Sequence, residues 1–174
     1  FMQEMGSMKE GGFIDSLALE QDGYAPEHTY NTSMDVYYNT DTLLTLGYLD
    51  YSYSGGAHGL YATQVASYDI QRQRRLRITD ILYPGYEARV GDILAQTFRK
   101  AYGLGEREPL NTILFDSTIL PNDNFGITSK GIFFVYVPYE IAPYVVGEIE
   151  LFVAFEAIED FVKPEWWTAP KHQN

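Results

Sequence analysis

The chain has 174 residues, a length that fits one ordinary folded domain with a single core. Hydrophobic residues make up 45% of it and charged residues 21%, which excludes a disordered protein, and no run of about 20 apolar residues suggests a membrane span. Cysteine is absent, so disulfides, thiolate zinc sites and cysteine nucleophiles are excluded. The net charge of -12 repels polyanions, so we expect no nucleic acid ligand, and a cationic partner fits the charge better.

The first part of the chain is predicted to be helical. Apolar residues within positions 1–17 recur at roughly helical spacing, although two adjacent glycines interrupt them. Because the sequence opens with Phe1 rather than methionine, we expect it to be the continuation of a longer gene product. A targeting signal could lie in that upstream part.

The next part of the chain has the pattern of β-strands. Residues 34–38 and 43–53 flank a short polar stretch and predict a hairpin. Residues 60–70 predict a third strand, with residues 75–78 returning beside it. Nine of the fifteen tyrosines lie between residues 24 and 68. Their rings either pack within the sheet or form a contact surface for a protein or a carbohydrate.

The clearest helix lies at about residues 86–103, where apolar residues recur every three or four positions and Gly103 can end the helix. Residues 132–137 are apolar throughout, as in a central strand, and residues 148–154 alternate as in a strand with one exposed face. Residues 155–162 then suit a short helix. The sequence therefore predicts an α+β fold, with a mostly antiparallel twisted sheet packed against one long helix and short terminal helices.

One glycine-rich segment has a specified backbone. Gly55, Gly56 and Gly59 surround His58 directly after a predicted strand, and glycines mark places where the backbone turns sharply. The imidazole hydrogen-bonds the backbone and holds this loop, or it contacts a ligand, or it serves as a metal ligand or general base. No motif for zinc or for a serine nucleophile is present, so we expect neither a metal nor a cofactor.

A second segment, residues 138–147, contains two prolines within an apolar region. Glu140 lies between Tyr139 and Tyr144, whose rings could partly desolvate its carboxyl group. Glu140 therefore either serves in chemistry or binding, or holds the local structure through hydrogen bonds. Two further glutamates, at positions 148 and 150, point to the same side of one strand, which is not how the paired carboxylates of a glycosidase face each other.

Several motifs resemble a known family when they are taken in order. They are Tyr53–Gly59, Tyr68–Ile70, residues 125–132 and residues 136–147. Together they resemble a bacterial cell-envelope domain of unknown function, which forms the extracellular C-terminal domain of the anti-sigma factor RsiV and the non-catalytic domain of the deacetylase PdaC. The resemblance covers about residues 48–162 and rests on several motifs, so it is specific.

The resemblance implies an extracytoplasmic location, in the periplasm or at the cell surface, often with a lipid or a membrane helix as an anchor. It also implies a lysozyme-like partner, because the RsiV domain senses lysozyme by binding it. Family members commonly carry a small preceding module. We therefore expect residues 1–47 to be the tail end of such a module, packed on a main domain of residues 48–174.

The leading hypothesis is an extracytoplasmic binding or sensor module that recognises a cationic protein such as lysozyme, or a cell-wall glycan such as a peptidoglycan fragment. Membrane contact is expected only through a missing N-terminal anchor. The candidate binding residues, which we expect to converge at one end of the sheet, are Gly55, Gly56, His58, Tyr139, Glu140 and Tyr144. The alternatives are an enzyme acting on wall polysaccharide, with Glu140 as the acid and His58 as its helper, and a purely structural accessory domain.

Overall fold

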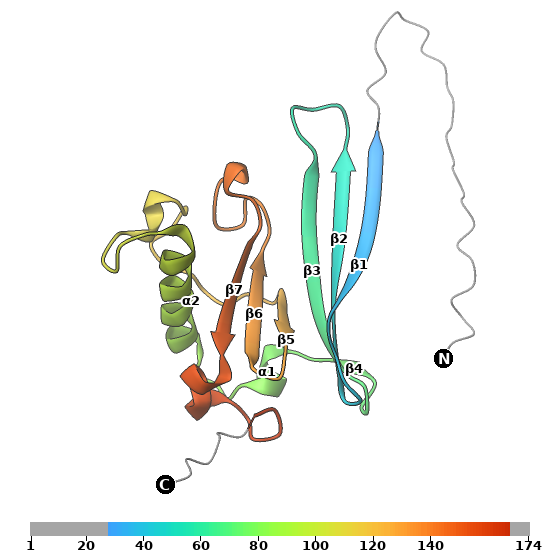
Figure 1. The fold of residues 1–174 in the computed structure, drawn as a ribbon, viewed down its shortest axis with the longest axis vertical. Coiled ribbons are helices and arrows are strands. Elements are labelled where there is room, and N and C mark those ends of the chain that lie inside the picture. The colour runs from blue at the N-terminus through green and yellow to red at the C-terminus, as the bar shows by residue number, and fades with distance from the viewer. Residues whose placement is uncertain (1–27, 168–174) are drawn as a thin grey trace, which may run out of the picture.

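The computed structural model describes residues 28–167, so the helix predicted within residues 1–17 lies outside the described part of the chain. The described strands form two antiparallel sheets (Figure 1). The first sheet has the order β1-β2-β3-β4 and consists of β1 (Thr29–Asn39), β2 (Leu43–Tyr53), β3 (Leu60–Asp69) and β4 (Arg74–Arg75). The second has the order β5-β6-β7 and consists of β5 (Phe125–Ile127), β6 (Gly131–Tyr136) and β7 (Ile149–Ala154).

The long predicted helix is present as α2 (Glu87–Tyr102), and it ends at Gly103, whose φ of 69° is the left-handed conformation of a helix end. The other helical elements are short: α1 (Ile78–Ile81) and the 3-10 helices η1 (Leu110–Thr112), η2 (Tyr144–Val146) and η3 (Phe155–Phe161). The predicted α+β class is confirmed. The strands are divided between two sheets, and α2 covers only the second of them (Figure 1).

The predicted hairpin is formed by β1 and β2, and β1 begins at Thr29, five residues earlier than the apolar pattern indicated. The turn between the strands is closed by Thr40, whose hydroxyl oxygen accepts a hydrogen bond from the backbone N–H of Leu43 at 3.0 Å. Both strands are 11 residues long. This length separates the two ends of the first sheet by roughly 30 Å.

The returning strand predicted at residues 75–78 is shorter than expected, because β4 has two residues and α1 already begins at Ile78. Asp80 explains the difference. Its carboxylate accepts hydrogen bonds from the backbone N–H of Arg77 at 2.8 Å and from the guanidinium of Arg74 at 2.9 Å, which starts a helical turn in place of a strand.

The two sheets meet where β5 lies beside β3 (Figure 1). Along the outer edge of β3, the side chain of Asn124 forms the hydrogen bonds that a neighbouring strand would otherwise form. Its side-chain oxygen accepts from the Val65 N–H at 2.7 Å, and its amide nitrogen donates to the Thr63 carbonyl at 2.8 Å. The Glu148 carboxylate also accepts from the Thr63 N–H, at 2.9 Å. Side chains that lie directly before β5 and β7 therefore satisfy backbone groups of the first sheet, which covers an otherwise open edge.

The main core lies between α2 and the second sheet. On α2, Val90, Leu94 and Phe98 are fully buried, as the periodicity predicted. They face β6 and β7, where alternate residues of β7 are buried while Glu150 and Phe152 point to the opposite side. A rigid α/β unit thus supports the β6–β7 connection, whereas β2 and β3 support the glycine-rich loop.

The domain boundary expected at residue 47 falls within β2, and the proposed division into a preceding module and a main domain stays a prediction. Within residues 28–167, no helix combines the length and the hydrophobicity needed to span a bilayer.

Candidate functional site

The two segments singled out in the sequence meet at one end of the molecule. The β2–β3 loop contains the glycines and His58, and the β6–β7 connection contains Tyr139, Glu140 and Tyr144 (Figure 1). The Tyr144 hydroxyl donates a hydrogen bond of 2.5 Å to the carbonyl oxygen of Gly59, which is 85 residues away in sequence. The expected convergence of the two segments is therefore observed, while their role in binding stays a prediction.

His58 is exposed and contacts both segments. Its ring stacks on the ring of Tyr144 with a centroid distance of 3.8 Å and an angle of 17°. Its Nδ1 atom lies 3.0 Å from the Gly59 carbonyl oxygen, which can only accept a hydrogen bond. The bond therefore requires a proton on Nδ1, and in the neutral ring this leaves Nε2 as an acceptor. His58 holds the loop, and its second ring nitrogen forms no hydrogen bond with another residue of 28–167.

The three glycine positions of the loop differ in whether they could accept a larger residue. Gly55 has a φ of 88°, a conformation that favours glycine. A Cβ atom on Gly59 would lie 2.5 Å from the far end of the Tyr51 ring, so any larger residue there would force this ring to shift. A Cβ atom on Gly56 would have its nearest neighbour 3.9 Å away. Gly55 and Gly59 thus shape the loop, whereas Gly56 tolerates a side chain.

Tyr139 occupies an unusual position in a β-turn formed by residues 137–140. The Glu140 N–H donates to the Val137 carbonyl at 3.0 Å, which closes the turn, and Pro138 and Tyr139 lie in its centre. Tyr139 has a φ of 71°, which matches the third position of a type II turn, where glycine or asparagine is usual. The Tyr139 side chain is 55% exposed. A bulky residue in this conformation is strained, and such strain is typical of functional sites.

Glu140 holds the turn rather than the glycine-rich loop. One of its carboxylate oxygens accepts from the Val137 N–H at 2.9 Å, and the other accepts from the side-chain amide of Asn122 at 2.8 Å. Among residues 28–167, no hydrogen bond joins Glu140 to His58. Glu140 therefore fixes the backbone that presents Tyr139.

Four rings gather at this end of the molecule, and we call them the tyrosine–histidine cluster: His58, Tyr61, Tyr139 and Tyr144. The rings of Tyr139 and Tyr144 are 5.5 Å apart, and Tyr61 meets Tyr144 edge to face at 6.0 Å. Burial raises the pKa of the Tyr144 hydroxyl, and the neighbouring tyrosines add to the rise. The Tyr144 hydroxyl thus stays protonated and remains a hydrogen-bond donor.

Sequence reasoning missed two members of this end of the molecule. Tyr61 falls within the general aromatic surface of the sequence, although its place two residues after Gly59 is a signal of its nearness to the loop. Val145 is 90% exposed, at the tip of η2, and was treated as part of an apolar run. An apolar side chain this exposed adds contact area beside Tyr144.

Glu148, directly before β7, and Glu150, on β7, lie outside the cluster. The Glu148 carboxylate accepts a hydrogen bond from the Thr63 N–H of β3, and Glu150 follows two residues later on β7. Desolvation raises the pKa of the Glu150 carboxyl group, and the nearby Glu148 carboxylate adds to the rise. No group of three histidine, aspartate or glutamate side chains within the described residues could hold a metal ion.

Two family models match the sequence in succession. Residues 79–156 match a family described as a protein of unknown function (DUF3298), and residues 1–61 match the model described as deacetylase PdaC. The resemblance drawn from the motifs is confirmed: the chain carries a domain of unknown function that resembles the non-catalytic domain of PdaC. No match was found among curated proteins.

Solved structures agree with these matches. A member of the DUF3298 family from Bacteroides fragilis is 26% identical with a TM-score of 0.73, over 82% of this chain and 57% of that one. The chain thus spans little more than half the length of this relative. A DUF3298 family protein from Pseudomonas aeruginosa is 22% identical with a TM-score of 0.66, over 84% of this chain and 68% of that one. At this identity the second likeness shows the fold alone.

Proposed function

We propose that this chain is an extracytoplasmic binding module of a bacterial envelope protein, and that the tyrosine–histidine cluster contacts a cationic protein such as lysozyme. The observation that carries the proposal is the left-handed backbone of Tyr139 beneath a 55% exposed ring. Glycine would adopt this conformation at a lower cost, so stability alone does not account for a tyrosine there. Contact between the ring and a partner does account for it.

The cluster has the properties of a protein contact surface. Tyrosine supplies a large contact area at a small entropic cost, and it is enriched among the residues that dominate binding energy. The ring of Tyr144 is already fixed by the hydrogen bond to Gly59 and by the stacked His58. Rings that are ordered before binding lose less freedom when a partner arrives. Val145 extends the surface with an exposed apolar side chain.

Charge favours a cationic partner. The net charge of -12 attracts a basic protein over a distance of about 10 Å at moderate salt and repels anionic ones. Lysozyme is basic, and the resemblance to RsiV points to the same partner. A wall glycan is the other ligand class that the resemblance implies, although glycan binding gains less from the net charge. The envelope location rests on the resemblance as well.

Calorimetric titration tests this proposal and separates the two ligand classes. The chain is titrated with lysozyme and, separately, with soluble muropeptides. We expect saturable heat with lysozyme that weakens as salt increases, and at least about tenfold weaker binding in Tyr139→Ala and Tyr144→Ala. Saturable heat with muropeptides but not with lysozyme would mean that the cluster binds a glycan and not a protein. The absence of heat with every ligand would refute the binding role of the cluster.

A further inference from the structure

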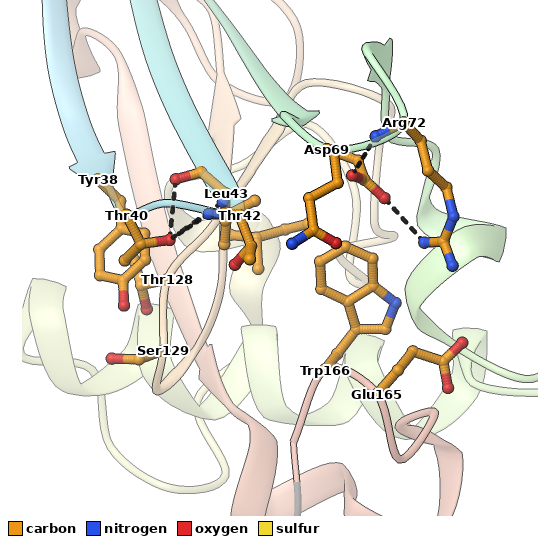
Figure 2. A pocket seen from close by; sticks show the side chains of 12 residues that line it. Tyr38, Thr40, Thr42, Leu43, Asp69, Arg72, Thr128, Ser129, Glu165 and Trp166 are labelled. Carbon is orange, nitrogen blue, oxygen red and sulfur yellow. Dashed lines mark hydrogen bonds and ion pairs between the residues drawn. The ribbon is translucent and has the colours of Figure 1, made fainter.

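A pocket of about 460 Å³ lies at the end of the first sheet opposite to the tyrosine–histidine cluster. It is open to solvent and is lined by the β1–β2 turn, the turn after β3, the β5–β6 turn and the segment around Trp166 (Figure 2). Its volume is in the range of small-molecule sites. Sequence patterns do not predict this pocket, because three separate polar turns and a tryptophan far along the chain form it together.

Two aromatic side chains stand on different sides of this pocket, Tyr38 near the β1–β2 turn and Trp166 below Asp69 (Figure 2). The indole Nε1–H of Trp166 donates to the Asp80 carbonyl at 2.9 Å, which fixes the orientation of the ring. Both side chains are only partly buried. A fixed aromatic face open to solvent suits a ligand that has both apolar C–H groups and polar groups, such as a sugar ring.

The polar side chains of the pocket fall into two groups. Both carboxylate oxygens of Asp69 already accept hydrogen bonds, one from the backbone N–H and one from the guanidinium of Arg72, each at 2.8 Å. Gln71, Ser129 and Glu165 are exposed, and their side chains make no hydrogen bond to another residue within 28–167. An amide, a hydroxyl and a carboxylate around one space can both donate and accept hydrogen bonds. They match a ligand that carries several hydroxyl groups.

The charges around the pocket favour a neutral ligand. The guanidinium of Arg72 is paired with the Asp69 carboxylate at 2.8 Å, which reduces its attraction for an anion. The Glu165 carboxylate lines the same pocket and would repel an anion. The mixed polar and aromatic lining also disfavours a purely apolar ligand, which would leave the polar groups without water or partners.

We infer that this pocket binds a neutral pyranose sugar, with the ring of the sugar against Trp166 and Tyr38 and its hydroxyl groups hydrogen-bonded by Gln71, Ser129 and Glu165. This site is separate from the tyrosine–histidine cluster, at the far end of β2, and takes a different class of ligand. It stands whether or not the cluster binds a protein.

Intrinsic fluorescence can report on this pocket directly. The chain has two tryptophans, so Trp167→Phe leaves Trp166 as the single tryptophan, which is excited selectively at wavelengths where tyrosine does not absorb. The variant is titrated with glucose, galactose, N-acetylglucosamine and, as an anionic counterpart, glucuronate. We expect a saturable change in Trp166 emission with at least one neutral sugar at millimolar concentration, and weaker binding of glucuronate.

Variants at the two ends of the molecule show whether the sugar binds in this pocket. Gln71→Ala combined with Glu165→Ala removes two exposed side chains, which leaves the fold intact, and should weaken sugar binding at least tenfold. Tyr139→Ala, at the other end of the molecule, should leave sugar binding unchanged. The inference is overturned if no sugar gives a saturable change up to about 100 mM, if the double variant binds as tightly as its parent, or if glucuronate binds more tightly than every neutral sugar.

Discussion

The hydroxyl of Tyr144 donates a hydrogen bond of 2.5 Å to the carbonyl oxygen of Gly59, which ties the β6–β7 connection to the β2–β3 loop. We predict that Tyr144→Phe lowers the free energy of unfolding by about 1 kcal/mol, because the ring stays but the hydrogen bond is lost. Urea denaturation measures this change. Tyr68 is an exposed tyrosine whose hydroxyl forms no hydrogen bond with another residue of 28–167, so Tyr68→Phe should change stability by less than about 0.5 kcal/mol. Equal stability of all three proteins would contradict the importance of this link.

The glycine-rich loop gives a second prediction. Gly59→Ala should destabilise the protein by about 1–3 kcal/mol, because the new Cβ atom would lie 2.5 Å from the ring of Tyr51. Gly56→Ala is the matched control and should have little effect, since its Cβ atom meets no atom closer than 3.9 Å. Thermal unfolding of both variants compares them directly. A Gly56→Ala variant as unstable as Gly59→Ala would show that the loop differs from the structure described.

The junction of the two sheets depends on Asn124. Asn124→Ala should cost at least about 2 kcal/mol, because the Val65 N–H and the Thr63 carbonyl both lose a hydrogen-bond partner at a partly buried edge. Asn31→Ala, at an exposed position on β1, should cost less than about 0.5 kcal/mol. Denaturant titration followed by circular dichroism measures both. A small effect of Asn124→Ala would mean that water replaces its amide easily.

The dependence of stability on pH tests the environment of Glu150. The raised pKa of its carboxyl group means that the folded protein binds this proton more tightly than the unfolded chain does. The free energy of unfolding should therefore fall as pH rises from the ordinary glutamate pKa through the raised one. Glu150→Gln cannot ionise, so above this range it should be more stable than the wild type by a few tenths of a kcal/mol, reduced by solvent screening.

Stability curves at pH 4 and pH 8 are sufficient to check this sign. At pH 4 the wild-type carboxyl group is protonated and therefore uncharged, like the glutamine, so the extra stability of Glu150→Gln should disappear there. A variant that is less stable than the wild type at pH 8 would show that the Glu150 carboxylate is stabilised rather than destabilised in the folded protein.

Local patterns predicted most of the elements but not how they combine. The periodicity of α2 and the alternation of β2 and β7 are set by which face is buried, so both could be predicted from the sequence. The junction of the two sheets could not, because there the Asn124 side chain, and not a strand, binds backbone groups about 60 residues earlier in the chain. A lone asparagine before a strand carries no signal of such a contact.

The candidate site shows the same limit. Glycine and proline marked the two segments correctly, because these residues are tied to special backbone conformations. The left-handed conformation of Tyr139 was not predicted, since its residue type argues against it. The role of Glu140 was left open between chemistry and structure, and its two hydrogen bonds within the turn were beyond sequence reasoning.

Two substitutions separate the backbone of Tyr139 from its ring. Both Tyr139→Ala and Tyr139→Gly remove the ring and its contact with Tyr144, but only glycine relieves the left-handed conformation. We predict that Tyr139→Gly is more stable than Tyr139→Ala by about 1 kcal/mol. Chemical denaturation of the two variants measures the difference. Equal stability would mean that the turn relaxes in the alanine variant.

The most direct test of a contact role for the tyrosine–histidine cluster is the calorimetric affinity of Tyr139→Gly for lysozyme, compared with that of the wild type. The account predicts saturable binding to the wild type and at least about tenfold weaker binding to the variant, which nevertheless stays folded. Unchanged affinity in a folded Tyr139→Gly variant would contradict it.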